Sequence, residues 1–244
     1  MIIGIDGGIN VGKSSVAASL VKNHGYTELS LAYHLKQMCM YVFNLSYAQV
    51  WSQEGKAKEV PNPMKPNHRH AIRMMNYIYG TLDWPDDDWA RKACLLDSIT
   101  KACPVFKTPR QVLQIVGTEF IRKAFDEEFW IKITMDYILR KKLDRVVISD
   151  ARFHNEKTIL RENGAKIIFV KCLGTMTGLE SPQPQEVHQS EKEKWSDSEY
   201  DYRILNNKAS GLDMLDLNVN CMVEYFNCYG SIGNKETNEN YDQL

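Results

Sequence analysis

The sequence predicts an α/β fold in which helices cover both faces of a parallel sheet. Short apolar runs with the character of buried strands alternate with helical segments along much of the 244-residue chain. Such alternation is typical of βαβ units, whose helices pack on both faces of the sheet. The first apolar run leads into a glycine-rich turn and then into a helix within residues 1–22. A composition of 43% hydrophobic and 25% charged residues is ordinary for a globular domain.

Five segments are predicted to be strands because they are apolar and too short for a helix. The run at 26–30 has the weakest pattern, and the run at 145–150 ends in the carboxylate of Asp150. The five predicted strands are residues 1–6, 26–30, 145–150, 165–171 and 201–206.

Six segments are predicted to be helical, and local signals mark several of their ends. Pro109 suits the first position of a helix, Gly164 suits a helix end, and Ser210 suits an N-cap. The acidic run 86–88 favours the start of the helix that follows. The six predicted helices are residues 15–22, 32–43, 91–102, 109–142, 155–163 and 210–225.

The segment from Gly7 to Ser14 has the pattern of a phosphate-binding loop, G-x-x-x-x-G-K-[ST]. Glycines let the backbone adopt positive φ, and consecutive amides at a helix N-terminus form an anion site. We expect Lys13 to reach the β- and γ-phosphates of ATP and the Ser14 hydroxyl to bind Mg²⁺. The other residues expected to contact ATP are Gly8, Asn10, Val11, Gly12 and Ser15.

Charge and cysteine spacing exclude several classes of protein. A net charge of −1 shows no overall electrostatic preference for nucleic acid. The six cysteines form no C-x-x-C pair, which excludes a zinc ribbon, and their scatter indicates a reducing cytosol. No apolar run approaches the roughly 20 residues that span a bilayer. We therefore expect a cytoplasmic protein without a stable nucleic-acid or membrane partner, and a homodimer stays open.

Composition shifts divide the chain into a core and additions. Pro61, Pro63 and Pro66 interrupt the stretch 47–108, which otherwise has helical patterns, and the stretch 174–200 is polar. We expect the first to be a substrate-binding helical insertion and the second to be a lid. The predicted division is a nucleotide-binding core at 1–46, 109–173 and 201–229, an insertion at 47–108, a lid at 174–200 and a mobile tail at 230–244.

Asp150 and Arg152 are the first candidates for a second part of the site. Ligands of open α/β sheets bind beyond the carboxyl ends of the strands, which is where Asp150 falls. Its carboxylate could hold Mg²⁺ directly or through water, and Arg152 could bind an anion. The alternative is a surface turn with a weak ion pair.

Several further residues have a functional and a structural interpretation of similar weight. Arg110 and Arg122 could bind phosphate bidentately or be solvated helix arginines. Gly117 costs about 1 kcal/mol inside a helix, so it indicates close approach of a substrate or another backbone. Trp130 could stack on a base or belong to the core. Lys36, Arg69 and Arg73 could contact the substrate or be solvated. His188 and Glu191 of the lid could help to close the site or be exposed.

Together these residues resemble the phage-type deoxynucleoside monophosphate kinases. The resemblance spans nearly the whole chain and is thin over 47–107. One departure is Ser15, where family members often carry an acidic residue, and this affects the metal contact more than the fold. The motifs are Gly7 to Ser14, Leu31-Ala32 with Lys36, Leu113-Gln114 with Gly117-Thr118-Glu119, Trp130, Asp150-x-Arg152 with Asn155-Glu156, His188-x-Ser190-Glu191, and Asn206-Asn207.

The resemblance implies a three-layer P-loop fold with a monophosphate-binding insertion, and phosphorylation of deoxynucleoside monophosphates by Mg-ATP. We expect Lys13, Arg110, Asp150 and Arg152 to be catalytic. The basic residue expected from the insertion is Arg69 or Arg73. The resemblance implies that the monophosphate site is lined by Lys36, Arg110, Gly117, Thr118, Trp130, Asp150, Arg152 and Glu156, and Arg122 is a further candidate for binding the substrate.

Two alternatives stay open at this point. One is another small-molecule P-loop kinase, acting on a nucleoside or a coenzyme precursor. A nucleoside kinase needs a carboxylate base, for which Asp6 could serve. The other is a P-loop ATPase that acts on a protein or nucleic-acid partner and hydrolyses ATP without a small acceptor.

Overall fold

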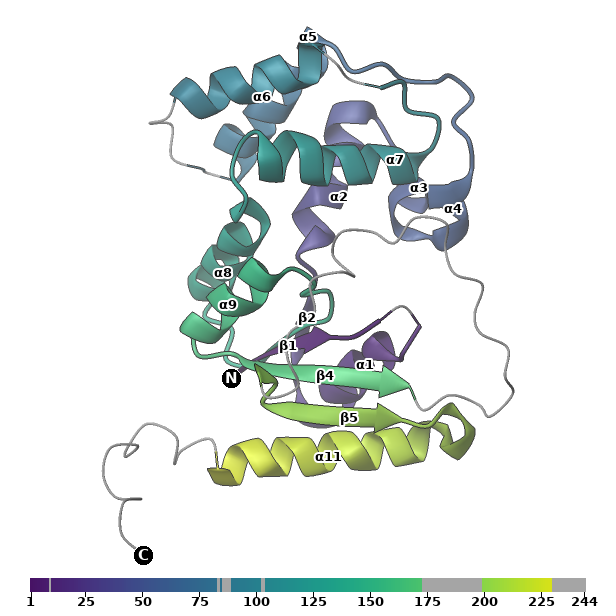
Figure 1. Ribbon diagram of the computed structural model, residues 1–244, viewed down its shortest axis with the longest axis vertical. Helices are drawn as coiled ribbons and strands as arrows, with labels where there is room; N and C mark the ends of the chain where they lie inside the picture. Colours follow the sequence, from purple (N-terminus) through teal and green to yellow (C-terminus); the bar gives the residue numbers. More distant parts are fainter. Residues whose placement is uncertain (9, 83, 85–88, 102–103, 173–198, 230–244) are drawn as a thin grey trace, which may run out of the picture. The chain divides into compact units, whose positions relative to one another are not determined.

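The computed structural model describes residues 1–8, 10–82, 84, 89–101, 104–172 and 199–229 (Figure 1). Contacts divide the chain into two compact units, which we call unit 1 and unit 2. Unit 1 comprises Met1–Glu28 and Asp144–Leu244, and unit 2 comprises Leu29–Leu143. Unit 2 contains the predicted insertion 47–108 and extends beyond it at both ends. Residues 173–198 and 230–244, which include nearly all of the predicted lid and the predicted tail, lie outside the described residues.

The sheet of unit 1 confirms the predicted α/β fold with parallel strands. Its order is β2-β3-β1-β4-β5 (Figure 1). The β1–β3, β1–β4 and β4–β5 pairs are all parallel, and Gly4 of β1 lies opposite Ile148 and Ile167. The strands are β1 Ile2–Asp6, β2 Thr27–Leu29, β3 Val146–Ile148, β4 Lys166–Cys172 and β5 Tyr202–Asn206.

Helices cover both faces of this sheet. Helices α1 (Lys13–His24) and α11 (Gly211–Tyr229) share one buried core with β1, which includes Ile3, Ile5 and Leu20. Gly4 points to the opposite face because side chains alternate along a strand. A Cβ at Gly4 would lie 3.1 Å from Leu160 of α9 (His154–Glu162), so α9 covers that face.

Unit 2 is helical and has its own core, with Met38, Met74 and Phe106 among its fully buried side chains. Four of its described helices begin with an N-cap whose side chain accepts a backbone hydrogen bond, at Ser46, Ser52, Asn67 and Thr108. The α-helices are α2 Ala32–Phe43, α3 Tyr47–Trp51, α4 Gln53–Ala57, α5 His68–Asn76, α6 Trp89–Lys101, α7 Pro109–Gln114 and α8 Phe129–Lys141. Two further segments are π-helical, η1 Tyr77–Thr81 and η2 Ile115–Lys123.

The predicted helix 109–142 is divided into α7, the π-helix η2 and α8. A turn between η2 and α8 is held by Asp126, whose buried carboxylate accepts from Glu128 N at 2.8 Å. The same carboxylate forms ion pairs with Arg91 and Lys132. This turn ends the helix where periodicity alone would continue it.

Two other helix ends also bear on the predictions. Helix α11 begins at Gly211, directly after a 3-10 turn at Lys208–Ser210 (η4), and it ends at Tyr229 rather than at 225. The acidic run 86–88 lies outside the described residues, and α6 begins at Trp89. Among the described helices, none is both long enough and apolar enough to cross a membrane.

Candidate active site

The phosphate-binding loop joins β1 to α1 and has the backbone that its glycines predict. Positive φ angles occur at Gly7 (146°), Asn10 (59°) and Gly12 (104°). A Cβ on Gly7 would lie 2.4 Å from the carbonyl oxygen of Val170, so a larger residue cannot occupy this position without moving β4. Ile9 lies outside the described residues.

Lys13 is folded onto the loop that precedes it. Its Nζ donates hydrogen bonds to the carbonyl oxygens of Gly7 and Gly8, the second at 2.6 Å. Ser15 N and Val16 N are the first helical donors to Gly12 O, both at 3.0 Å. The earlier amides of α1 come before this first helical bond, so they are suited to binding an anion. The Ser14 hydroxyl, on an exposed residue of the first turn, can reach a metal ion beside that anion.

Asn206, at the end of β5, braces the same loop. Its side chain is on a buried residue, and Nδ2 donates to Val11 O at 2.9 Å. A Cβ on Gly12 would lie 2.2 Å from this Nδ2 atom. The loop is therefore packed against β5 as well as β4.

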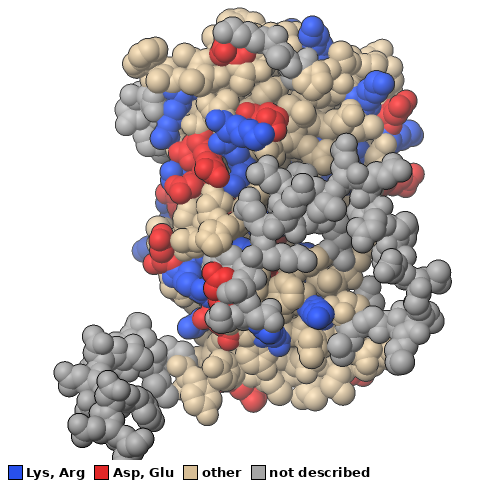
Figure 2. Space-filling view, in the orientation of Figure 1, with Lys and Arg blue, Asp and Glu red and all other residues tan. Residues whose placement is uncertain are grey.

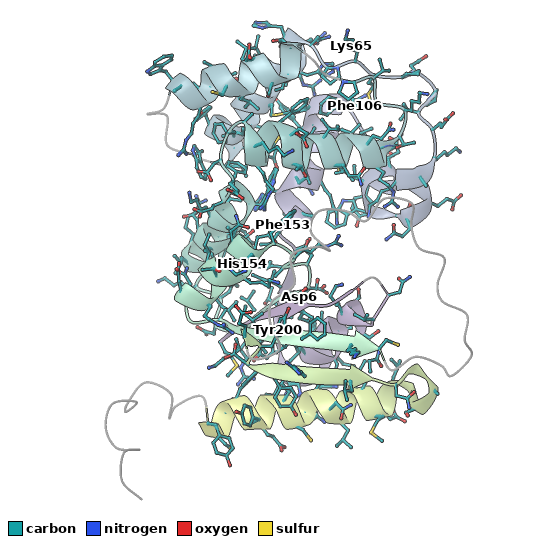
Figure 3. The ribbon with its side chains drawn as sticks, in the orientation of Figure 1. Asp6, Lys65, Phe106, Phe153, His154 and Tyr200 are labelled. Carbon is teal, nitrogen blue, oxygen red and sulfur yellow. The ribbon has the colours of Figure 1, made fainter. Side chains whose placement is uncertain are left out.

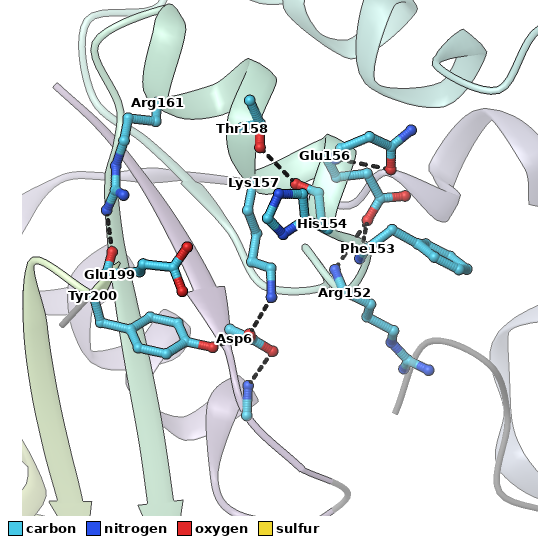
Figure 4. Close-up of polar contacts among 12 residues, drawn as sticks. Asp6, Arg152, Phe153, His154, Glu156, Lys157, Thr158, Arg161, Glu199 and Tyr200 are labelled. Atoms are coloured by element: carbon cyan, nitrogen blue, oxygen red, sulfur yellow. Dashed lines mark hydrogen bonds and ion pairs between the residues drawn. The ribbon is translucent and has the colours of Figure 1, made fainter. Parts of the chain in front are cut away.

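Asp6, the last residue of β1, has both carboxylate oxygens engaged (Figures 3 and 4). Oδ1 accepts from Gly7 N at 2.7 Å. Oδ2 accepts from Lys157 Nζ at 2.7 Å and from the Tyr200 hydroxyl at 2.6 Å. Sequence analysis missed Lys157 and Tyr200. The one available signal was an acidic residue directly before the loop, which requires a partner if it is buried.

The turn after β3 carries Asp150 and Arg152, and a buried glutamate holds it. Glu156 is 4% exposed, and its Oε2 accepts from Arg152 N at 2.9 Å and from Phe153 N at 3.0 Å (Figure 4). The side chain of Glu156 therefore binds backbone amides at the start of α9. Arg152 is exposed, and β3 is the neighbour of β1 in the sheet. The turn and the phosphate loop therefore leave adjacent parallel strands at the same edge, as the sequence predicts.

In unit 2, Gly117 and Trp130 lie close together. Trp130 is 5% exposed, and its Nε1 donates to Gly117 O at 3.1 Å. A Cβ on Gly117 would lie 2.8 Å from Leu35 Cδ2 of α2. The glycine thus allows α2 and the π-helix η2 to pack closely, and π-helical segments are frequent at functional sites. Thr118 follows in η2 and is half-buried.

The basic candidates of unit 2 have different surroundings. Lys36 Nζ lies 3.9 Å from the centre of the Trp51 ring. Arg110 is exposed and its Nη2 donates to Gln53 Oε1 at 3.2 Å. Arg122 is 8% exposed, which is low for an arginine and excludes a solvated helix face.

Arg69 and Arg73 lie on α5. Arg73 stacks over the Tyr41 ring at 4.9 Å and donates to the Tyr41 carbonyl oxygen, while Arg69 is exposed. The substrate roles of these candidates of unit 2 stay predictions. His188 and Glu191 lie outside the described residues.

Comparison with known proteins shows which kinases the chain is similar to. Residues 94–210 match the family model of deoxynucleotide monophosphate kinase. The chain is a relative of these kinases. It is 28% identical, over 86% of its own length and 90% of the other protein, to a protein of Acanthamoeba polyphaga mimivirus provisionally named a deoxynucleotide monophosphate kinase. It is 43% identical over 58 residues, 24% of its length, to the deoxynucleoside-5′-monophosphate kinase of Escherichia phage T5, of which the match covers 23%.

The resemblance to deoxynucleotide monophosphate kinases drawn from the motifs is thus confirmed. The range matched by the family model contains η2, the Asp150–Arg152 turn and Asn206. It also contains Lys157 and Tyr200, which donate to Asp6, the residue directly before the phosphate loop.

Proposed function

We propose that the chain transfers the γ-phosphoryl group of ATP to a deoxynucleoside 5′-monophosphate and so makes the diphosphate. The supporting observation is the placement of the phosphate loop and the Asp150–Arg152 turn on adjacent strands of one sheet, in a relative of the deoxynucleotide monophosphate kinases. Two anion-binding elements at one sheet edge suit a donor and an acceptor that both carry phosphate.

The loop residues fit the triphosphate and its metal ion. Lys13 exchanges its bonds to the Gly7 and Gly8 carbonyls for bonds to the β- and γ-phosphates. The Ser14 hydroxyl would hold Mg²⁺, and Asp150 would contribute to the same ion directly or through water. When bound, Mg²⁺ neutralises charge that develops on the transferred group.

The acceptor needs no strong base. Its nucleophile is a phosphate oxygen that is already ionised at neutral pH, so catalysis consists of positioning and charge stabilisation. Arg152 is the candidate in unit 1 for binding that phosphate. The residues of unit 2 named by the resemblance, including Arg110, Lys36 and Trp130, stay candidates for binding the monophosphate.

The contacts of Asp6 disfavour a nucleoside kinase. A catalytic base must have an oxygen directed at the substrate hydroxyl. Asp6 instead accepts from Lys157, Tyr200 and the Gly7 amide. These three donors occupy the oxygens that a base would use.

The proposal also covers where the enzyme acts. The described cysteines are free, as expected in a reducing compartment, and ATP and Mg²⁺ are available in a cytoplasm. Positive and negative side chains are interspersed on the face drawn in Figure 2. We therefore propose a cytoplasmic enzyme that acts on small molecules and has no stable nucleic-acid partner.

The deciding experiment is a coupled ADP-release assay with Mg-ATP. Each deoxynucleoside and ribonucleoside monophosphate is tested singly, with nucleosides and a sample without acceptor as controls. We expect one or a few deoxynucleoside monophosphates to stimulate release, with the diphosphate identified by chromatography. Release that ignores every monophosphate would refute the proposal and favour a nucleoside kinase or a partner-dependent ATPase.

Two substitutions test the assigned residues. Lys13→Ala and Arg152→Ala are each expected to lower kcat/KM by 10²-fold or more, as loss of a charge-stabilising donor commonly does. Lys22→Ala, on an exposed residue in the last turn of α1, is the matched control. Near-native turnover by either variant with an unchanged melting temperature would show that its residue has no such role.

A further inference from the structure

Asp6, Lys157 and Tyr200 form a network that the proposed chemistry does not use. Asp6 ends β1, Lys157 lies on α9, and Tyr200 lies two residues before the start of β5. Lys157 and Tyr200 are 151 and 194 positions along the chain from Asp6, and both side chains donate to its carboxylate (Figure 4).

The network contains the charged ammonium group of Lys157 in the protein interior, where a charge is energetically unfavourable. The side chain of Lys157 is 0% exposed, and that of Asp6 is 15% exposed. A buried ammonium is strongly unfavourable without a partner, and an apolar pair of similar volume commonly stabilises a fold as well or better. The stability of the fold therefore does not require a lysine at position 157. The contacts of Lys157 indicate a second role for this side chain.

Those contacts lead to the phosphate loop. One carboxylate oxygen of Asp6 accepts hydrogen bonds from both Lys157 and Tyr200. The second carboxylate oxygen is therefore directed at Gly7 N, from which it accepts a hydrogen bond. Gly7 is the first residue of the loop, has a φ of 146°, and fits tightly against the Val170 carbonyl. The orientation of the carboxylate therefore sets the direction in which the chain enters the loop.

Lys157 and Tyr200 are themselves held in place. Lys157 is the next residue after Glu156, which fixes the turn carrying Arg152. The ring of Tyr200 packs on Phe169 of β4, with centroids 4.9 Å apart. Next to it, Asp201 Oδ2 accepts from Ile167 N at 2.8 Å and from Arg161 at 3.0 Å. Both donors to Asp6 thus project from rigid segments.

We propose that Lys157 and Tyr200 are positioning residues for the ATP phosphates, acting through Asp6. They orient its carboxylate, which holds the Gly7 amide and so presets the loop for the donor. Because Lys157 and Glu156 are adjacent on α9, this helix also connects the donor loop to the Asp150–Arg152 turn. The expected changes in KM rest on the proposed function. The expected change in Mg-ADP affinity requires only that the phosphate loop binds a nucleotide.

Tyr200→Phe is the sharpest variant because it removes one oxygen and keeps the ring on Phe169. Tyr26→Phe is the matched control, since Tyr26 is buried in the same unit and its hydroxyl donates to the Met1 sulfur rather than to Asp6. Mg-ADP affinity is measured by calorimetry, KM for ATP and for the monophosphate by the coupled assay, and the melting temperature by circular dichroism.

We expect Tyr200→Phe to weaken Mg-ADP binding by about tenfold, the scale of one hydrogen bond to a charged group. KM for ATP should rise similarly, while KM for the monophosphate and the melting temperature change little. Lys157→Met should weaken binding further. Tyr26→Phe should bind Mg-ADP as the native protein does.

The outcomes separate this inference from the proposed function. Unchanged Mg-ADP affinity in Tyr200→Phe, or an equal loss in Tyr26→Phe, would overturn the positioning role, even where Lys157→Met does not fold. A native protein that binds Mg-ADP but phosphorylates no monophosphate would refute the proposed function alone, and the affinities would still decide this inference. A native protein that binds no nucleotide would overturn both.

Discussion

Replacing Glu156 by alanine is expected to loosen the turn that carries Asp150 and Arg152. The carboxylate accepts from two backbone amides, at 2.9 and 3.0 Å, on a residue that is only 4% exposed. A buried amide left without its acceptor costs about 1–3 kcal/mol. Because two amides are affected, we expect Glu156→Ala to lower the free energy of unfolding by about 2–6 kcal/mol.

Glu156→Gln separates the hydrogen bonds from the charge. Both amides donate to the same oxygen, Oε2, so the carbonyl oxygen of glutamine can accept both. The remaining loss is a negative charge in the first turn of α9, which stabilises a helix by about 0.3–1 kcal/mol. The glutamine variant should therefore retain most of the stability that the alanine variant loses.

The assay is urea unfolding at pH 7 for both variants and for Glu162→Gln. Glu162 is exposed at the opposite end of the same helix, so its loss should be nearly neutral. Equal destabilisation by Glu156→Gln and Glu156→Ala would refute the reasoning, because it would show that the charge and not the amide bonds holds the turn.

Three other perturbations test separate parts of the structure. Gly117→Ala should destabilise the protein by about 1–3 kcal/mol in thermal unfolding, because its methyl group would lie 2.8 Å from Leu35 Cδ2. The double variant Gly117→Ala with Leu35→Ala should recover part of the lost stability, because the contacting side chain is removed. Burial, and then the charge of Arg140, lowers the pKa of His34, so the unfolded chain binds a proton more readily. The free energy of unfolding should therefore fall as the pH drops below about 6.5, and less so in His34→Gln, as measured by urea titrations at pH 7.5 and 5. Asn206→Ala should weaken Mg-ADP binding by about 3–10-fold, because it removes one hydrogen bond to the phosphate loop. Asn207→Ala, at the adjacent asparagine, should leave the affinity for Mg-ADP unchanged.

The features that sequence predicted well are those encoded locally. The strand at 26–30 had the weakest pattern, yet it forms β2, and the glycine spacing predicted the backbone of the phosphate loop. The Pro109 signal was also correct, with Thr108 as the N-cap of α7. Each of these depends on φ/ψ preferences or on periodicity within a few residues.

The features that sequence did not predict depend on partners far along the chain. Lys157 lies in a polar stretch and looks like a solvated helix residue, and its burial becomes evident only with Asp6 beside it. The turn at Asp126 likewise depends on Arg91. A π-helix uses the same residue types as an α-helix, so η2 left no signal except the glycine at 117.

The way the chain joins unit 1 to unit 2 has a consequence for how such proteins diversify. Unit 2 occupies one continuous stretch, Leu29–Leu143, and unit 1 resumes at Asp144. Thr27 N donates to Arg145 O at 2.9 Å, so the chain leaves and re-enters unit 1 at neighbouring points. An insertion with adjacent ends can be lengthened, shortened or exchanged by recombination without reordering the strands. Natural variation should therefore accumulate in unit 2 as whole-segment replacements, while the order β2-β3-β1-β4-β5 is inherited intact.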